Sequence, residues 1–369
     1  MTTTTTTTTT GSDADAGTAT GDPLEKPVQG RIKCIVWDLD NTLWDGVLIE
    51  DEAVKVRDSV VEHIRRLDTM GVLHSIASRN DREHALGKLR DLGLAEYFLY
   101  PQITWDGKSA SIRLIAEELN LGLDAFAFVD DQEFERDEVA HGAPGVTCVD
   151  IADLDEALQR PEFVPRFVTE ESARRREMYR GQIDRNELER EFTGTNEQFL
   201  AELQMTFTIE RAGEEDLQRA EELTVRTNQL NSTGRTYSYE ELDALRSSPD
   251  HLLLIASLTD KYGSYGKIGI ALVEKGSENW QLHLLLMSCR VMARGVGMVL
   301  LNHIMRLAKE AGAGLRADFV ETGRNRMMQI TYAFAGFTEV GRDGTRLVLA
   351  ADMGALQPPP AHVRVEIHG

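Results

Sequence analysis

Short apolar runs alternate with amphipathic stretches between Ile32 and Asp150. The apolar runs cover residues 34–37, 72–77, 126–129 and 146–149. The stretches 60–70 and 110–119 lie between them and are long enough for helices. Four apolar residues of the second stretch recur at helical spacing: Ile112, Ile115, Ala116 and Leu119. This alternation predicts βαβ units in a doubly wound parallel sheet, with the helices packed on its faces.

The pattern changes after Met205. Runs at 252–258, 267–274 and 280–288 predict a β-rich meander, and 295–312 predicts a helix. A charge-rich, periodic segment at 170–203 follows Pro161 and Pro165 and predicts a helical connector. We therefore expect four parts after the N-terminal tail. These are an α/β domain at 31–160, a connector at 161–204, an α+β domain at 205–352 and a C-terminal tail at 353–369.

The N-terminus has low complexity, with threonine at every position from 2 to 10 and a stretch rich in Gly, Ser, Asp and Ala after it. Such a sequence cannot bury a core, so residues 1–30 are predicted to be disordered. The chain has 369 residues, of which 41% are hydrophobic, and a formal net charge of −21. That charge argues against non-specific binding to nucleic acid or to an anionic membrane.

Neither a membrane segment nor a disulfide framework is predicted. No apolar run approaches the roughly 20 residues that cross a bilayer, and the N-terminus lacks an apolar signal core, so we expect a cytoplasmic protein. The cysteines are Cys34, Cys148 and Cys289. They lie too far apart to suggest a metal cluster, and their odd number in a cytosolic chain indicates reduced thiols.

Two carboxylates, Asp38 and Asp40, directly follow the first apolar run. The carboxyl end of a strand faces the ligand crevice of a doubly wound sheet. Residues two apart could serve one site if the chain leaves the pleat there, and Asn41 and Thr42 favour such a turn. One acid could then attack phosphorus while the other handles a proton. A solvated turn is the alternative for such a pair taken alone.

Further polar residues follow in order along the chain. Ser78 comes after the second apolar run and could donate a hydrogen bond to phosphoryl oxygens, or cap a helix. Lys108 precedes an amphipathic helix and could neutralise phosphoryl charge, or be solvated. Asp130 and Asp131 end the third run and supply the oxygen ligands that magnesium prefers, unless they form an acidic turn. The ordered set favours a phosphotransfer site.

These motifs resemble those of the haloacid dehalogenase (HAD) superfamily, whose first motif is Asp-x-Asp-x-Thr, here residues 38–42. In that resemblance Asp38 is the nucleophile and Asp40 the acid and base, while Ser78 and Lys108 assist. Mg²⁺ is held by Asp38, the carbonyl of Asp40, and Asp130 or Asp131. The residues that the resemblance places against the phosphate or substrate are Asn41, Thr42, Arg79 and Asn80.

The longer strings resemble the FkbH-like branch of this superfamily over residues 32–349. They are DLDNTLWDGVLIED, LHSIASRND, FLYPQITWDGKSASI and FVDDQEFERDEV, followed by TNQLNSTGRTYS, MSCRVMARGVG and TGRNRMMQITYAFAGF. Members are understood to take glyceryl from 1,3-bisphosphoglycerate, remove phosphate, and load the acyl group onto the phosphopantetheine thiol of an acyl carrier protein. The product leads to hydroxymalonyl or methoxymalonyl extender units in polyketide and antibiotic biosynthesis. Some relatives carry Cys where this chain has Leu39, so another thiol would hold the acyl group, or the carrier would accept it directly.

The second half resembles the GNAT acyltransferase fold, so the expected fold class is a HAD-like domain followed by a GNAT-like α+β domain. A glycine-rich loop in that fold binds the pyrophosphate of coenzyme A through backbone N–H groups. Here the loop contains Gly295 and Gly297, but Met292 replaces the usual Gln or Arg, which weakens the expectation of coenzyme A. The other residues that we assign to acyl or pantetheine binding are Asn228, Arg290, Arg294, Asn325 and Tyr332.

Cys289 lies between the last run of the meander and this loop. Its thiolate could accept an acyl group with help from Arg290 and Arg294, or it could be a buried packing residue. Two other functions stay open. The first domain could be a phosphatase of another small metabolite, with the second domain docking a carrier, or the second domain could transfer acetyl from acetyl-CoA.

Overall fold

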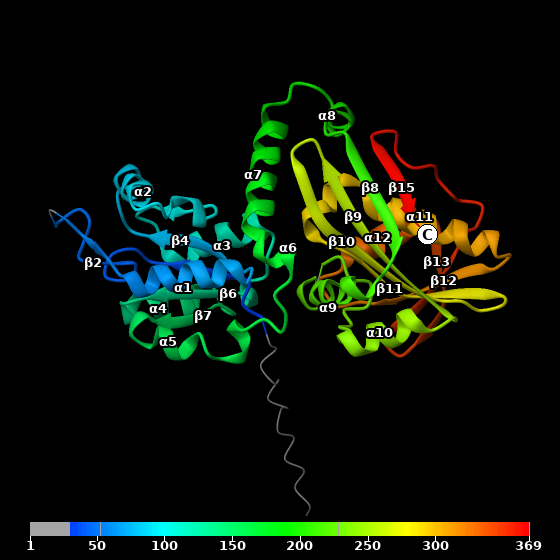
Figure 1. Cartoon of the computed structure of the whole chain (residues 1–369), viewed down its shortest axis with the longest axis horizontal. Helices are drawn as coiled ribbons and strands as arrows, with labels where there is room; N and C mark the ends of the chain where they lie inside the picture. The colour runs from blue at the N-terminus through cyan, green and yellow to red at the C-terminus, as the bar shows by residue number, and fades with distance from the viewer. Residues whose placement is uncertain (1–29, 52, 228, 369) are drawn as a thin grey trace, which may run out of the picture.

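The computed structural model describes residues 30–51, 53–227 and 229–368, so the predicted disordered tail, apart from Gly30, lies outside the described residues. Figure 1 shows two domains side by side, with a long helix standing between them. Within the described residues, no helix is both long enough and apolar enough to cross a membrane.

The first domain is built on a five-stranded parallel sheet in the order β5-β4-β1-β6-β7. Its strands are β1 (Cys34–Trp37), β4 (Leu73–Ser78), β5 (Gln102–Ile103), β6 (Phe126–Asp130) and β7 (Thr147–Asp150). Its helices are α1 (Asp58–Thr69), α2 (Arg82–Asp91), α3 (Lys108–Leu119), α4 (Glu133–Gly142) and α5 (Leu154–Ala157). A small hairpin of β2 (Trp44–Asp45) and β3 (Lys55–Val56) follows β1.

The two faces of this sheet bury alternate residues of β1. Ile35 and Trp37 pack in one cluster with α1, α2 and α5, whereas Cys34 and Val36 pack in another with α3 and α4. The four apolar residues predicted on one face of α3 are all buried there. The doubly wound sheet predicted from the alternating runs is therefore confirmed, because helices cover both faces of the sheet and β1 buries apolar side chains on each.

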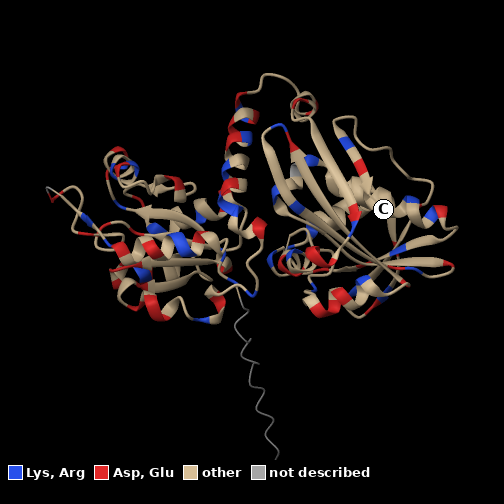
Figure 2. Cartoon of the chain, viewed as in Figure 1, with Lys and Arg blue, Asp and Glu red and all other residues tan. Residues whose placement is uncertain are grey.

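The segment between the two domains is helical. It contains α6 (Glu170–Ala173), α7 (Arg175–Glu191) and α8 (Asn196–Glu202). Figure 2 shows acidic and basic residues mixed along α7, which stands between the two domains. The helix α8 begins with a capping box in which Thr195 and Gln198 satisfy each other's backbone N–H groups.

The second domain has an eight-stranded sheet in the order β13-β14-β12-β11-β10-β9-β8-β15. The strands are β8 (Met205–Arg211), β9 (His251–Asp260), β10 (Gly263–Glu274), β11 (Asn279–Met287), β12 (Gly314–Val320), β13 (Phe337–Asp343), β14 (Arg346–Ala351) and β15 (Val363–His368). Its helices are α9 (Leu217–Arg226), α10 (Tyr239–Ser247), α11 (Val296–Glu310) and α12 (Arg326–Phe334). The pair α9 and α10 packs on one face of the sheet and the pair α11 and α12 on the other. This mixed α+β arrangement confirms the second part of the predicted fold class.

The C-terminal segment differs from the tail predicted at 353–369. Residues 363–368 form β15, which pairs in parallel with β8 at the edge of the sheet. Val363 and Val365 pack against the core of the domain. Val363 and Val365 alternate with polar residues, as in a strand with one buried face. The segment is too short for this alternation to predict a strand from the sequence.

The strands β11 and β12 pair only from Asn279 to Leu282 of β11 and then separate. The chain's own segment 230–232 lies in the opening. The Met287 N–H donates to the Leu230 carbonyl at 2.8 Å, and the Ser232 N–H donates to the Leu285 carbonyl at 3.0 Å. On the other side, the Val320 N–H donates to the Ser232 carbonyl at 3.0 Å. The opened strands therefore have their backbone groups satisfied from within the chain.

The amino edge of the parallel sheet faces the second domain and the connector. Lys33, just before β1, donates from Nζ to the Arg226 carbonyl of α9 at 2.6 Å. Gly71, just before β4, accepts from the Arg175 guanidinium at 2.9 Å. Asp124, just before β6, pairs with Arg324 at 3.2 Å. The carboxyl edge of the same sheet consequently points away from the second domain, toward the β2 end of Figure 1.

Candidate functional site

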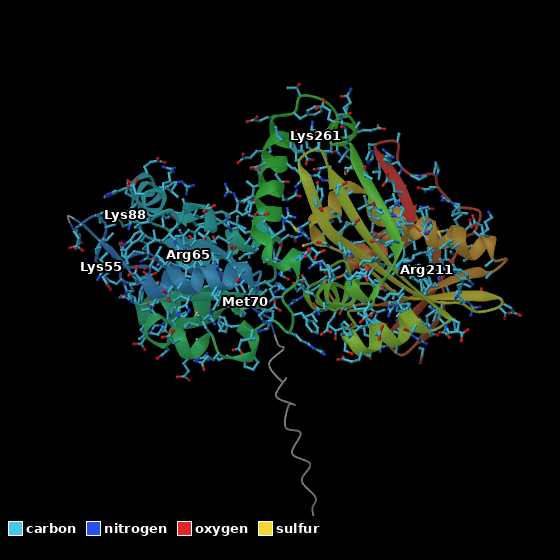
Figure 3. All side chains as sticks on the ribbon, in the orientation of Figure 1. Lys55, Arg65, Met70, Lys88, Arg211 and Lys261 are labelled. Atoms are coloured by element: carbon cyan, nitrogen blue, oxygen red, sulfur yellow. The ribbon has the colours of Figure 1, made fainter. Side chains whose placement is uncertain are left out.

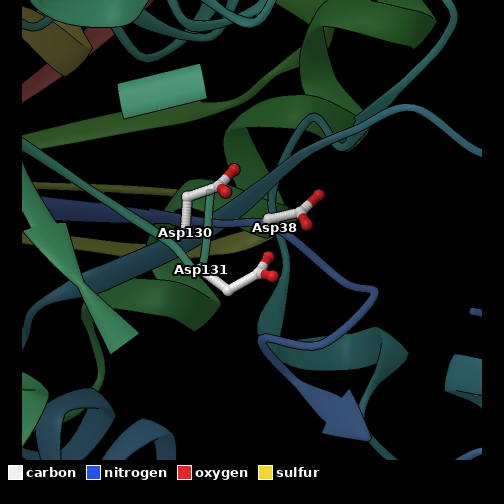
Figure 4. A group of neighbouring side chains, drawn as sticks. All are labelled: Asp38, Asp130 and Asp131. Atoms are coloured by element: carbon white, nitrogen blue, oxygen red, sulfur yellow. The ribbon is translucent and has the colours of Figure 1, made fainter. Parts of the chain in front are cut away.

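Three carboxylates meet at the carboxyl edge of the parallel sheet. The register pairs Trp37 of β1 with Val129 of β6, so the residues that follow, Asp38 and Asp130, lie side by side. Asp38, Asp130 and Asp131 each place one oxygen within 4.8 Å of the others. Figure 4 shows the three side chains directed toward the same space. We call these carboxylates, together with Lys108, the acid site.

Lys108 is the first residue of α3, which places its ammonium inside the acid site. Its Nζ lies 2.9 Å from Asp38 Oδ1 and 2.5 Å from Asp130 Oδ2. Glu135 of α4 is a further carboxylate, with Oε2 at 3.7 Å from the same ammonium. Arg79 pairs with Glu135 at 2.8 Å, so Lys108 is left as the one cation in contact with Asp38 and Asp130 among the described residues. Although burial acts to lower the pKa of Lys108, the charges of Asp38 and Asp130 raise it above its ordinary value.

Burial also decides the state of Asp38, which is only 4% exposed. It raises the pKa of Asp38 to about 6, and the charge of Asp130 acts in the same direction while Lys108 opposes it. A buried carboxylate is costly unless its charge is offset. One ammonium cannot offset several carboxylates, so the acid site has an excess of negative charge.

The residues of the acid site fit a magnesium ion, which the sequence analysis predicts. Asp131 Oδ1 is buried and has no hydrogen-bond partner among the described residues. Burial, followed by the charge of Asp130, raises the pKa of Asp131. An acceptor oxygen without a donor, beside two further carboxylates, is the donor set that a hard divalent cation takes. Mg²⁺ would satisfy both the oxygen and the excess charge.

Asp40 lies beside this group and is held by three donors. Its Oδ1 accepts from the indole Nε1 of Trp44 at 2.8 Å and from the backbone N–H of Leu48 at 3.1 Å. Its Oδ2 accepts from the amide of Asn80 at 2.9 Å. Asn41 follows with φ of 55°, so the chain leaves the extended conformation at the predicted point. The carboxylate of Asp40 is fixed in direction, as a proton-transfer group requires.

The remaining predicted residues of the first domain surround this centre. Ser78 ends β4 and is 3% exposed, whereas the N-cap of α2 is Asp81, which accepts from the His84 N–H. Thr42 accepts from the Asp131 N–H at 3.2 Å and so joins the two acidic loops. Arg79 pairs with Glu135 at 2.8 Å.

Sequence reasoning missed two members of the site, Trp44 and Glu135. Trp44 stands within the quoted motif string, where an indole N–H four residues after Asp40 was an available signal. Glu135 reaches the acid site from the first turn of α4, near Asp130 in sequence, and no local pattern distinguishes it from the other acids of that helix.

The predicted residues of the second domain do not form a single group. Asn325 is fully buried and donates to the carbonyls of Asn231 and Val320, each at 2.9 Å. Tyr332 is 1% exposed, and its ring packs against Phe319 and Phe337. Both have an evident structural role. Asn228 lies outside the described residues.

The glycine loop begins α11, with Gly295 at φ of 73° in the left-handed region that favours glycine. Gly295 and Gly297 line an apolar pocket of about 140 Å3. Its walls also contain Met287, Met292, Met298, Met327 and Met328. Such a lining suits an apolar chain better than a phosphate group.

Cys289 and Arg290 lie in the turn Cys289–Arg294 after β11, at the junction of the two domains. Burial raises the pKa of the Cys289 thiol, and the charges of Arg290 and Lys33 act against that rise. The thiol form therefore predominates at neutral pH. Arg294 is 2% exposed and pairs with Glu189 of α7 at 3.3 Å.

Comparisons with known proteins give partial likenesses. No protein-family model matches the chain, and no curated protein matches it. The chain is similar to the N-terminal part of a Bacteroides fragilis protein that contains a phosphatase domain and was solved with Mg. That match has 28% identity and a TM-score of 0.33, and it covers 37% of this chain and 42% of the other, less than half of each.

Two N-acetyltransferases are also similar to parts of the chain. The match with the PaiA N-acetyltransferase of Thermoplasma acidophilum, solved with coenzyme A, has 18% identity and a TM-score of 0.33 over 39% of this chain and 98% of the other. The match with the N-acetyltransferase PseH of Campylobacter jejuni has 18% identity and a TM-score of 0.24 over 30% of this chain and 72% of the other.

Proposed function

We propose that the protein removes phosphate from a three-carbon phosphorylated acid and transfers its acyl group to a carrier thiol. The observation that carries the proposal is the acid site, where Asp38 and Lys108 lie 2.9 Å apart among carboxylates that fit magnesium. The proposed donor is 1,3-bisphosphoglycerate, the proposed acceptor is the phosphopantetheine thiol of an acyl carrier protein, and the transferred unit is glyceryl.

Phosphate removal uses Asp38 as the nucleophile. One carboxylate oxygen of Asp38 forms a bond to phosphorus as the bond from phosphorus to the substrate alkoxide breaks. Asp40 gives a proton to that alkoxide and then takes one from the water that cleaves the aspartyl phosphate. Lys108 holds Asp38 in place and offsets phosphoryl charge. A magnesium ion held by Asp38, Asp130 and Asp131 would supply further positive charge to the phosphoryl oxygens.

The acyl step needs a thiol. Sulfur attacks the carbonyl carbon of the acyl phosphate, the bond from that carbon to the phosphate oxygen breaks, and the thiol proton leaves with the phosphate or to water. The candidates are Cys289 and the carrier's own phosphopantetheine. The raised pKa of Cys289 favours the second, because a neutral thiol is a weak nucleophile.

The acid site and Cys289 lie far apart. Lys108 begins α3, and the last residue of that helix, Leu119, lines a pocket with Cys289. A helix of 12 residues is roughly 18 Å long at 1.5 Å per residue. A three-carbon acid cannot span that distance. A long flexible arm such as phosphopantetheine can, which supports a carrier as the partner.

Intact-mass spectrometry of carrier protein incubated with the enzyme, Mg²⁺ and 1,3-bisphosphoglycerate tests the proposal. We expect a mass increase equal to glyceryl. An acetyl adduct formed from acetyl-CoA would identify an ordinary acetyltransferase instead. Phosphate release from 3-phosphoglyceryl carrier should also exceed release from a panel of free phosphorylated metabolites, and a preference for a free sugar phosphate would contradict the proposal.

A further inference from the structure

Positive charge is concentrated where the two domains meet. Glu222 of α9 is bound by three arginines: Arg175, Arg219 and Arg226. Each of these four side chains is no more than 11% exposed. Lys33 and Arg290 lie close enough for their charges to act on members of this group. We call these five basic residues the cation cluster.

One carboxylate does not balance the cation cluster. Burial and the charge of Arg226 lower the pKa of Lys33 to about 8. Burial and the charge of Arg219 lower the pKa of Arg290 to about 10. By exposed area Lys33 and Arg290 are partly buried, and cations withdrawn from water are costly unless an anion offsets them. The junction therefore carries an excess of positive charge, whereas the acid site carries an excess of negative charge.

Arg290 and Lys33 are the two members that pair with no carboxylate of the described residues, and Lys33 instead donates to the Arg226 carbonyl. The Arg290 guanidinium donates to Met178 Sδ at 2.8 Å and to Ser288 Oγ at 3.4 Å. No carboxylate of the described residues lies within 4.0 Å of it. The acids nearby are engaged elsewhere, since Glu189 pairs with Arg294 and Glu118 with Arg190. A guanidinium is the group best suited to bind carboxylate or phosphate oxygens through two parallel hydrogen bonds.

Arg290 is one of the residues that line a pocket of about 170 Å3. This pocket is smaller than the roughly 300–1,000 Å3 of drug-sized sites, and so suits a small metabolite. The first domain contributes Tyr100, Glu118 and Asn120 to its wall, and the turn after β11 contributes Cys289, Arg290 and Arg294. The helix α7 adds Tyr179, Gln182, Asn186 and Glu189, whose spacing places them on one face of the helix. The charge of Glu189 is offset by Arg294 at 3.3 Å.

We propose that this pocket, the junction pocket, binds a small phosphorylated or carboxylated anion, with the Arg290 guanidinium as its main contact and the Cys289 thiol in its wall. The bound anion supplies the negative charge that the cation cluster lacks. The inference deepens the proposed function, on which the choice of a three-carbon phosphorylated acid rests. It adds a second anion site at the edge of the first domain opposite to the acid site.

Protection of Cys289 from iodoacetamide tests the junction pocket, with 3-phosphoglycerate as the probe. Peptide mass spectrometry follows alkylation of each cysteine in the full chain without magnesium. At a probe concentration about ten times its Kd, mass action predicts that alkylation of Cys289 slows about tenfold. The neutral molecule glycerol should not protect. Equal alkylation rates with and without 3-phosphoglycerate, or equal protection by glycerol, would overturn the proposal.

Matched variants locate the effect. Arg290→Gln should lose the protection and Arg290→Lys should keep part of it. Arg211→Gln should behave as the wild type, because Arg211 is an exposed residue of β8 that lies away from the junction (Figure 3). Full protection in a folded Arg290→Gln variant would contradict the proposal. If Arg290→Gln does not fold, the comparison of 3-phosphoglycerate with glycerol in the wild type remains decisive.

The same experiment separates the junction pocket from the proposed function. Asp38→Asn should retain protection of Cys289, because the acid site lies at the other end of α3. Protection without any transfer of glyceryl to a carrier would defeat the proposed function and leave the anion site standing. Transfer of glyceryl to a carrier without protection of Cys289 would defeat the anion site and leave the proposed function standing.

Discussion

The acid site and the cation cluster are two buried groups of opposite charge at opposite edges of one sheet. In the first, a single lysine faces Asp38, Asp130 and Asp131. In the second, Glu222 pairs with three arginines, and the charges of Lys33 and Arg290 add to those of the arginines. A buried group with unequal charges lacks a counter-ion, so each edge indicates a ligand of a particular sign. The acid site calls for a cation and phosphate chemistry, and the junction calls for an anion.

A third buried pair shows what balance looks like. Arg185 of α7 binds Asp260 through two hydrogen bonds of 2.7 and 2.8 Å, and Tyr265 donates to the same carboxylate. The two side chains of the pair are 2% and 0% exposed. One cation meets one anion with good geometry, and the function of the pair is to fix α7 against β9 and β10. Burial of charge alone therefore does not distinguish a site, whereas unequal charge does.

The largest expected effect is on catalysis at the acid site. Asp38→Asn should reduce phosphate release at least about a thousandfold, because it removes the atom that bonds to phosphorus. Its melting temperature should not fall, since the substitution removes one charge from a negative excess. Malachite-green release and thermal unfolding measure the two. Asp45→Asn, at an exposed residue of the neighbouring hairpin, is the control and should keep full activity. Full turnover by Asp38→Asn would remove Asp38 from the mechanism.

The next largest effect is on stability at the junction. Although burial acts to raise it, the charges of Arg175, Arg219 and Arg226 hold the pKa of Glu222 far below its ordinary value. Glu222→Gln removes the carboxylate that binds three arginines of the cation cluster and should lower the free energy of unfolding by about 3–5 kcal/mol, measured by urea denaturation. Glu240→Gln, at an acid that is exposed, should cause no measurable loss. Equal stability of Glu222→Gln and the wild type would show that the cluster is not under electrostatic stress.

Magnesium should stabilise the protein through the acid site alone. At a concentration about 100 times its Kd, it should add about 2.7 kcal/mol to the free energy of unfolding by mass action. Asp131→Asn should weaken this gain, whereas Glu222→Gln should leave it unchanged because distant sites contribute additively. Urea denaturation with magnesium and with a chelator measures the difference. Identical curves for the wild type under both conditions would contradict the assignment of the acid site to a cation.

The acid site could be predicted from the sequence because its residues follow apolar strands. Parallel strands bring their carboxyl ends together, so Asp38, Ser78 and Asp130 reach one edge by topology. The junction has no such rule. Lys33 and Arg226 are 193 residues apart and meet only because two domains dock. Nothing local marks either residue, and the same holds for segment 230–232, which fills the opening between β11 and β12.

The smallest expected effect is at His283 of β11, whose charge is balanced by neighbouring carboxylates. Its Nδ1 lies 2.9 Å from Asp318 and its Nε2 lies 2.8 Å from Glu274, and Arg346 is 3.7 Å from Asp318. The hydrogen bond with Asp318 is the largest influence, and the pKa of His283 is raised. Burial is next in size and acts to lower the pKa, whereas the hydrogen bond with Glu274 acts to raise it. A raised histidine pKa contributes stability at low pH. That contribution is complete below about pH 6.5, the unfolded value, and is lost as pH rises through the folded value.

The free energy of unfolding should fall by no more than about 1 kcal/mol over this change of pH, because His283 and its partner Glu274 are partly exposed. Urea denaturation across pH measures the loss, with His283→Gln as the reference whose stability lacks this dependence. NMR titration of the ring gives the pKa directly, and Asp318→Asn should lower it more than Glu274→Gln does, because Glu274 is the more exposed partner. A ring pKa below that of free histidine would mean that burial outweighs both carboxylates. His283 would then be an exception to the rule that paired charges contribute little to stability and that unpaired charges mark ligand sites.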